Sequence, residues 1–346
     1  MEKVAARVSG LYGSWPVGDE SQTLYGSTPT FFRRPLRRRG EPLAGADVAF
    51  LGIPWRAPNP EGRSPINYEG SLLTPTYFRS NSSSFGGYLP ELELDVFEHL
   101  EMVDLGDADI VADMATSLGN VESRVAEAIA AGCMLVTVGG NSGVSTYPVL
   151  KAIAAATSGP TAVLNLDAHH DNERGEWQED DPRNPRWATT WARRILGLPG
   201  VDPGRYFHFG LRGALNDKET FLRFTERGVQ RENILTYRDL KEARREGFEG
   251  WAERLAGKIT SGAAMVWICI DPDVLNMGTN PDFGDEPMGP TNEEVIELLF
   301  QVGRAAGRDH FGGISFGAVP YTATSLHYAC FYFVLYALAG VALSPH

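Results

Sequence analysis

Short, mainly apolar runs alternate along this chain with segments in which apolar residues recur at helical spacing. The runs at 133–138, 161–166 and 264–270 predict strands that are buried on both faces of a sheet. Because strands that alternate with helices pair in parallel and are covered by those helices, the pattern predicts an α/β protein. We expect a three-layer α/β/α sandwich around a central, mostly parallel sheet.

The same two patterns predict the other elements. Further strands are expected at 47–54, 206–211, 234–237 and 312–319. Helices are expected at 121–131, 149–156, 216–227, 240–260, 292–306 and 326–343. Pro148 suits the first turn of the helix at 149–156, because that position needs no backbone donor. Residues 55–95 are expected to form a long loop region.

No internal repeat and no long linker divides the chain. Residues 1–45 are rich in Gly, Pro, Ser and Arg, and five arginines lie within Arg33–Arg39. We expect these residues to form an irregular N-terminal arm, either solvated or in contact with another subunit. Residues 46–346 are expected to form a single domain.

The overall charge limits the classes of partner. Acidic residues outnumber basic ones by 44 to 31, which gives a formal net charge of −13 and argues against a nucleic-acid-binding protein. The three cysteines lie far apart in apolar surroundings, so we expect free thiols in a reducing compartment. The first residues contain no apolar signal core, and we expect a cytoplasmic protein.

One segment has the composition of a membrane span. Residues 326–343 carry no charged side chain, and their length is at the lower limit for a helix that crosses a bilayer. The segment contains one histidine and several tyrosines, and basic residues are missing from both flanks. We therefore interpret it as a helix buried in the core or in a subunit interface, with no membrane involved.

Polar clusters follow three of the predicted strands. They are Gly139–Gly143 (GGNSG), Asp167–Asp171 (DAHHD) and Asp271–Asp273 (DPD). Ligand sites of open α/β sheets lie at the carboxyl ends of the strands, so these clusters are expected to converge. Each cluster alone could merely cap a strand or a helix.

Together the second and third clusters favour a metal site. In an extended segment, Asp167, His169 and Asp171 point to the same side. Asp271 and Asp273 add two more carboxylates with the same alternation. Several carboxylates in one place repel each other unless a cation neutralises them, and divalent metals accept such mixed oxygen and nitrogen ligands.

The clusters resemble motifs of the ureohydrolase superfamily, which includes arginase, agmatinase, guanidinobutyrase and guanidine hydrolase. The family motifs GGDHS, DAHxD and SxDxDxxDP correspond here to GGNSG, DAHHD and CIDPDVLN, in the same order. EPMGPT at 286–291 resembles the family segment EPGGLT, and FGLRG at 209–213 resembles its GIRG turn. The resemblance covers about residues 45–343 and implies an arginase-like form of the sandwich.

The resemblance also implies a reaction and a ligand set. The family hydrolyses a guanidinium C–N bond with the help of two metal ions that activate water. By this resemblance, Asp167 and Asp271 bridge both metals, His169 and Asp273 complete one metal site, and Asp171 belongs to the other. The implied metal is Mn²⁺ or Ni²⁺, which use the same ligand types.

The resemblance assigns Glu286 to the substrate. A carboxylate at this position would hold the guanidinium group through charge-assisted hydrogen bonds. The implied substrate is a cationic guanidine or biguanide, and the sequence does not distinguish one such compound from another.

The sequence departs from the family pattern at one metal site. Ser142 stands where GGDHS has its histidine ligand, with Asn141 beside it, and Asn276 replaces an aspartate. A hydroxyl is a much poorer ligand than imidazole for these metals. The family histidine that shuttles protons has no counterpart at 186–191, and His170 is expected to point away from the other ligands.

These departures leave three hypotheses open, none of which assigns a catalytic residue to this chain. The first is an accessory subunit, with a degenerate metal site or no metal, in a complex with a homologous catalytic subunit. The resemblance is then to bacterial metformin hydrolase, a heteromer, and the family assembles as trimers and hexamers; the run at 86–92 (GGYLPEL) supports this likeness. The second is a self-sufficient metal-dependent amidinohydrolase with an altered site. The third is a protein that binds a guanidine compound without hydrolysing it.

Overall fold

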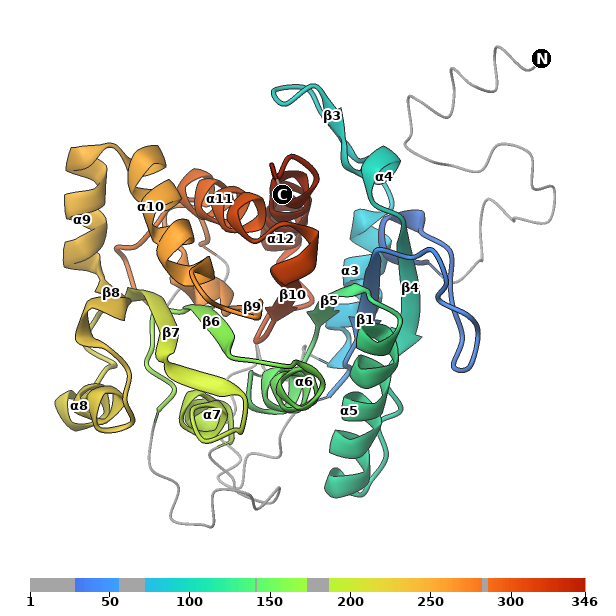
Figure 1. The fold of residues 1–346 in the computed structure, drawn as a ribbon, viewed down its shortest axis with the longest axis horizontal. Helices are drawn as coiled ribbons and strands as arrows, with labels where there is room; N and C mark the ends of the chain where they lie inside the picture. Colours follow the sequence, from blue (N-terminus) through green and yellow to red (C-terminus); the bar gives the residue numbers. More distant parts are fainter. Residues whose placement is uncertain (1–28, 56–71, 141, 173–186, 282–285, 346) are drawn as a thin grey trace.

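The fold is built on one sheet of eight strands, all paired in parallel (Figure 1). The computed structural model describes residues 29–55, 72–140, 142–172, 187–281 and 286–345, and only the backbone of 142–144 and 187–189. In spatial order the strands are β4 (Met102–Asp107), β1 (Val48–Gly52), β5 (Met134–Val138), β10 (Phe311–Phe316), β9 (Met265–Ile270), β6 (Thr161–Leu166), β7 (Val201–Leu211) and β8 (Ile234–Thr236).

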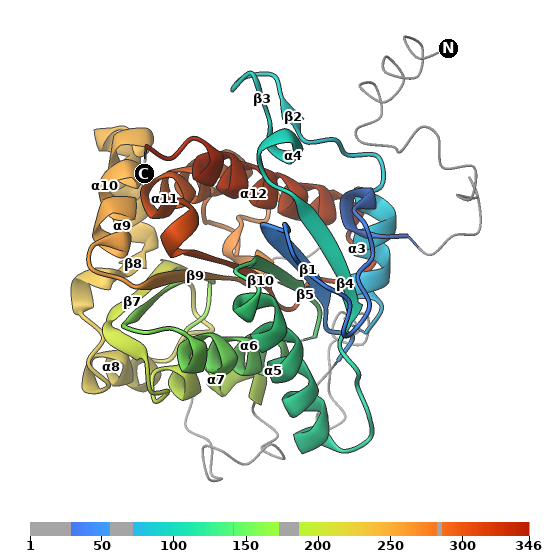
Figure 2. The same cartoon turned by 45° about the vertical axis from the view of Figure 1, so that its right-hand side comes forward.

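Helices cover both faces of the sheet, which confirms the predicted three-layer sandwich (Figures 1 and 2). The helices on one face are α3 (Thr74–Ser82), α4 (Val96–His99), α9 (Tyr237–Glu246), α10 (Phe248–Thr260), α11 (Asn292–His310) and α12 (Thr324–Ala342). Those on the other face are α5 (Met114–Ala130), α6 (Ser142–Ala156), α7 (Trp187–Ile195) and α8 (Lys218–Glu226). Cys133, Cys269 and Cys330 lie in the two hydrophobic cores as free thiols, as predicted.

Shorter elements complete the described chain. The hairpin of β2 (Tyr88–Leu89) and β3 (Leu94–Asp95) stands away from the sheet, beyond α4 (Figure 2). Single 3₁₀ turns occur at η1 (Phe31–Arg33), η3 (Arg231–Asn233) and η4 (Pro272–Val274). Of these, η4 matters most for the site, because it follows β9 directly.

Several predicted boundaries are wrong. Helix α6 begins at Ser142, so Pro148 lies inside it and not in its first turn; the burial of Val149 and Leu150 maintains the helix across the proline. The helix predicted at 240–260 is two helices, because Gly247 between them has a φ of 100°. Helix α3 lies within the segment that was expected to be a loop.

Strand β4 was not predicted, because Asp104 interrupts its apolar run. This aspartate is 0% exposed, and its Oδ2 atom accepts a hydrogen bond of 2.8 Å from Arg79 Nε. It also accepts one of 2.8 Å from the backbone N–H of Phe31. The buried charge is therefore paired, and a local apolar pattern could not reveal the partners.

The described part of the N-terminal segment packs on the domain. Phe31 and Phe32 are buried in the core, and the Arg34 guanidinium lies 4.2 Å from the centre of the Phe97 ring. Arg38 and Arg39 are exposed, as expected for an arm. The division into an arm at 1–45 and one domain at 46–346 stays a prediction.

Helix α12 has the length and hydropathy of a membrane span, but 67% of its apolar window is buried inside the fold. It packs along α11, while Tyr328 and Tyr332 remain exposed on its outer side. This burial agrees with the interpretation of 326–343 as a core helix.

Close packing of α11 and α12 gives a stability prediction. A Cβ atom added to Gly340 would overlap the carbonyl oxygen of Phe300 on α11. Gly340→Ala should push the helices apart and lower the free energy of unfolding by about 1–3 kcal/mol, measured by urea denaturation. Gly257→Ala in α10 is the control, because nothing lies within 4 Å of its Cβ position. Equal stability of Gly340→Ala and the unaltered protein would contradict the prediction.

Candidate metal centre

Two of the predicted polar clusters meet at the carboxyl edge of the sheet. Strands β6 and β9 are neighbours, with Leu166 paired to Ile270, so Asp167 and Asp271 follow them side by side. The backbone N–H of Asp271 donates to the Leu166 carbonyl at 2.9 Å. Although about a hundred residues separate them in the sequence, the two clusters therefore form one site, as the topology of α/β sheets predicts.

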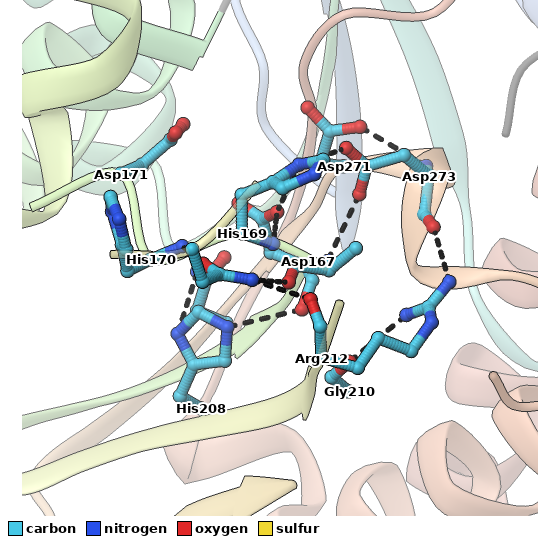
Figure 3. A network of polar contacts seen from close by, with 12 residues as sticks. Asp167, His169, His170, Asp171, His208, Gly210, Arg212, Asp271 and Asp273 are labelled. Atoms are coloured by element: carbon cyan, nitrogen blue, oxygen red, sulfur yellow. Dashed lines mark hydrogen bonds and ion pairs between the residues drawn. The ribbon is translucent and has the colours of Figure 1, made fainter. Parts of the chain in front are cut away.

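Asp167, His169 and Asp273 form a compact group (Figure 3). One ligand atom from each lies within 4.8 Å of the others. His169 Nδ1 lies 2.8 Å from Asp273 Oδ2, and the His169 backbone N–H donates to Asp167 Oδ1 at 2.7 Å. Two carboxylates and one imidazole are a ligand set that suits Mn²⁺, Ni²⁺ and similar divalent metals.

The electrostatics of this group also fit a cation. Asp167 is 1% exposed, and its Oδ2 atom is buried without a hydrogen-bond partner in the described structure. Burial, together with the charges of Asp273, Asp171 and Asp271, raises the pKa of Asp167 well above its ordinary value. A bound divalent cation would satisfy the buried oxygen and offset the repulsion, so the residues present fit a metal.

Asp273 is stabilised as a carboxylate by its neighbours. Burial opposes its ionisation, but the hydrogen bond and charge of His169 and the backbone N–H of Ala168 outweigh burial and lower the pKa of Asp273. Ala168 N lies 3.0 Å from Asp273 Oδ1. The Arg212 guanidinium acts in the same direction. Asp273 therefore ionises more readily than an ordinary aspartate and can serve as an anionic ligand.

Asp171 and Asp271 lie outside this compact group of described residues. Asp171 Oδ2 accepts a hydrogen bond of 2.8 Å from the Trp191 indole, and its carboxylate lies apart from His169 (Figure 3). The extended geometry expected for 167–171 ends at Asp171, whose φ is +40°. Asp271 Oδ1 caps η4 by accepting from the Asp273 N–H at 3.1 Å. The ligand roles of both aspartates stay predictions.

The remaining members of the polar clusters are placed only in part. His170 points away from His169 and lies against Asp217, with Nε2 3.6 Å from Oδ2. Asn141 lies outside the described residues, and for Ser142 only the backbone, at the start of α6, is described.

Glu286 is a buried carboxylate beside the turn that follows β7. It is 7% exposed, and no described residue donates a hydrogen bond to it. Its carboxylate occupies the space in which Gly213 would carry a Cβ atom, and Gly213 has a φ of +83°. The Arg212 guanidinium interacts with this charge, but a buried carboxylate that accepts no hydrogen bond from the described residues still favours a cationic ligand that can donate.

Comparison with known proteins identifies the family. The arginase family profile matches residues 46–310. The chain belongs to the arginase family. It is 33% identical over 277 residues to a mitochondrial guanidino acid hydrolase of Homo sapiens, which covers 78% of this chain and 70% of that protein. It is 27% identical over 286 residues to proclavaminate amidinohydrolase of Streptomyces clavuligerus, with 81% and 82% covered.

A solved structure shows the same fold. The formiminoglutamase of Trypanosoma cruzi, solved with Mn²⁺, superposes with a TM-score of 0.72 at 20% identity and covers 87% of this chain and 95% of that one. This likeness confirms the arginase-like form of the sandwich. Family membership places the chain among the amidinohydrolases and ureohydrolases, a group of hydrolases.

Two buried residues of this arginase-family site were missed at the sequence level. Burial lowers the pKa of His208 to about 3, so its imidazole is neutral, and its Nε2 donates to the Asp167 carbonyl at 3.1 Å. Arg212 is 6% exposed and donates to carbonyls of Gly210, Asp273 and other loop residues. The only sequence signals were a histidine inside an apolar strand and an arginine inside the FGLRG turn.

Proposed function

We propose that this chain is the accessory subunit of a hetero-oligomeric amidinohydrolase that hydrolyses a C–N bond of a guanidine or biguanide, as in bacterial metformin hydrolase. One observation carries the proposal: among the described residues, some ligand candidates lie in the compact group and others lie outside it. Asp167, His169 and Asp273 form a group that suits one cation, whereas Asp171 is bonded to Trp191. Ser142 also stands where the family motif has histidine. Among the described residues there is a group for one cation, and a site for one metal instead of the family's two would favour a supporting role.

The substrate class rests on Glu286. Its carboxylate is buried and lacks a donor in the described structure, which suits a guanidinium group that donates several hydrogen bonds. The human relative is named for guanidino acids, and this chain is 33% identical to it. A divalent metal, when bound, would supply Lewis-acid chemistry and acidify a water. The homologous catalytic partner, assembly as a trimer or hexamer and a cytoplasmic location are parts of the same proposal.

The test uses the chain alone and together with a homologue that has an intact GGDHS motif. Both preparations are expressed with Mn²⁺ or Ni²⁺, and metal content is measured per chain. Urea, amine and ammonia are then measured with a panel of guanidines and biguanides. We expect at most one metal in this chain, no turnover alone, and turnover by the pair. Two metals in this chain, or turnover without the partner, would overturn the proposal.

The alternative function is a self-sufficient amidinohydrolase. It is favoured by the survival of the compact group around Asp167, whose geometry needs no second chain. His169→Ala distinguishes the two functions, since His169 contributes the only imidazole to that group. In an accessory subunit this change should leave the turnover of the complex intact, whereas a self-sufficient enzyme should lose its turnover.

A further inference from the structure

The turn that follows β7 contacts the backbone on both sides of His169. In this turn, Asn216 Oδ1 accepts a hydrogen bond of 3.0 Å from the backbone N–H of His170. Its Nδ2 donates to the Ala168 carbonyl at 3.0 Å. Asn216 Nδ2 also donates to the Arg212 carbonyl within the turn. One half-buried amide therefore ties together the two residues that flank the imidazole ligand candidate.

The same turn contacts the second ligand segment through Arg212. Its Nη2 atom donates to the Asp273 carbonyl at 2.8 Å and to the Leu275 carbonyl at 3.1 Å. Its backbone N–H donates to the Ala168 carbonyl at 3.1 Å. Figure 3 shows the guanidinium reaching toward Asp273 from the side of Gly210. The turn at 212–216 thus links the segment after β6 to the segment after β9.

These contacts fix the direction of His169. Outside a strand, the hydrogen bonds of a sheet do not fix the φ and ψ angles of a peptide segment. Other contacts must then fix these angles if the side chain is to keep one direction. Asn216 holds the peptide groups before and after His169, and the imidazole then lies 2.8 Å from Asp273 Oδ2. Groups that orient metal ligands in this way commonly change metal affinity by 10- to 100-fold when they are removed.

We propose that Asn216 is a positioning residue that presets His169 for a divalent cation. The inference rests on the proposed function, in which the compact group of Asp167, His169 and Asp273 binds one cation. It assigns Asn216 no contact with the cation itself. Asn216→Leu preserves the approximate shape of the side chain and removes all three hydrogen bonds. Asn216→Asp preserves the acceptor for His170 N–H and removes only the donors.

Calorimetric titration with Mn²⁺ tests the proposal. We expect Asn216→Leu to bind Mn²⁺ at least about tenfold more weakly than the unaltered chain. Asn216→Asp should also bind more weakly, although its added negative charge by itself would attract a cation. Asn233→Leu is the matched control, because Asn233 Nδ2 likewise donates to a backbone carbonyl, that of Gly204 at 3.0 Å, away from the site. Unchanged affinity in Asn216→Leu, or tighter binding in Asn216→Asp, would overturn the proposal.

A second readout needs no metal and separates this inference from the proposed function. In a crystal structure of metal-free Asn216→Leu, we expect the His169 imidazole to leave Asp273, which it approaches to 2.8 Å here. Asn233→Leu should retain that contact. A retained contact in Asn216→Leu would overturn the positioning role, even if the unaltered chain binds no metal. Failure of the pair to turn over any guanidine or biguanide would count only against the proposed function.

Discussion

Asp167→Asn is expected to stabilise the metal-free protein and to abolish its response to divalent cations. The change removes one buried charge from a cluster of carboxylates, and the amide oxygen can still accept the hydrogen bond from the His169 backbone N–H. At pH values above the ordinary pKa of an aspartate, the unaltered chain must bury this charge or take up a proton on folding, and the variant does neither. Its free energy of unfolding should therefore be higher, by up to about 1.4 kcal/mol for each pH unit by which the folded-state pKa exceeds the ordinary one. For the unaltered chain, Mn²⁺ at 100 times its Kd should add about 2.7 kcal/mol, whereas the variant should gain nothing.

The pH dependence of stability has a definite sign. Burial raises the pKa of Asp167 in the folded state, so the folded protein holds an extra proton at pH values between the ordinary and the raised pKa. The free energy of unfolding of metal-free protein should therefore fall as pH rises through that interval, and Asp167→Asn should remove this loss. Thermal unfolding in EDTA and in Mn²⁺, at a series of pH values, measures both effects. Asp113→Asn, an exposed cap of α5, controls for the lost charge. A less stable metal-free Asp167→Asn would contradict the prediction.

Glu286→Gln is expected to weaken the binding of guanidinium compounds by about 10- to 100-fold. The carboxylate is buried and accepts no hydrogen bond from the described side chains, although the Arg212 guanidinium interacts with its charge, so its oxygens are available to a cationic ligand that donates hydrogen bonds. Hydrogen bonds to charged groups contribute about 1.5–3 kcal/mol, which corresponds to this loss of affinity. Calorimetric titration with guanidinium chloride at low concentration, and with a biguanide, measures the effect. Equal affinity of the variant and the unaltered protein would remove Glu286 from the binding site.

Gly213→Ala tests the same site by changing the residue next to the Glu286 carboxylate. An added Cβ atom at Gly213 would overlap the Glu286 carboxylate, so the variant should lose affinity to a similar extent. Gly40→Ala is the control for backbone strain, because its φ of +81° matches the +83° of Gly213 and nothing lies within 4 Å of its Cβ position. If both alanine variants bind guanidinium equally well, the proximity of Gly213 to Glu286 has no role in binding.

The sequence predicts the site best where polar residues directly follow apolar strands. Asp167 and Asp271 each follow an apolar strand, and the strands of an α/β sheet bring such positions to one edge. The alternation within 167–171 places His169 beside Asp167, but it does not hold at Asp171, whose backbone is left-handed. A single positive φ at a non-glycine residue has no reliable signature in the sequence.

The supporting residues could not be predicted, because their partners are backbone atoms of distant segments. Arg212 and Asn216 donate to carbonyls that follow β6 and β9, and a carbonyl is present at every residue. Asp104 presents the same difficulty in β4, since only the fold shows that Arg79 lies beside it. Local patterns thus identified the ligand candidates better than the residues that hold them.

The strand order has a consequence for biosynthesis. Strands β5 and β6 follow one another in the sequence, yet β10 and β9 lie between them in the sheet. On the ribosome, the sheet therefore remains split into two parts until residues 265–316 have emerged and inserted between them. Such late, long-range pairing is slow and leaves apolar strand edges exposed in the meantime. The growing chain has Asp167 and His169 long before Asp273, so a nascent chain cannot present the complete cation-binding group to a partner before its synthesis is nearly finished.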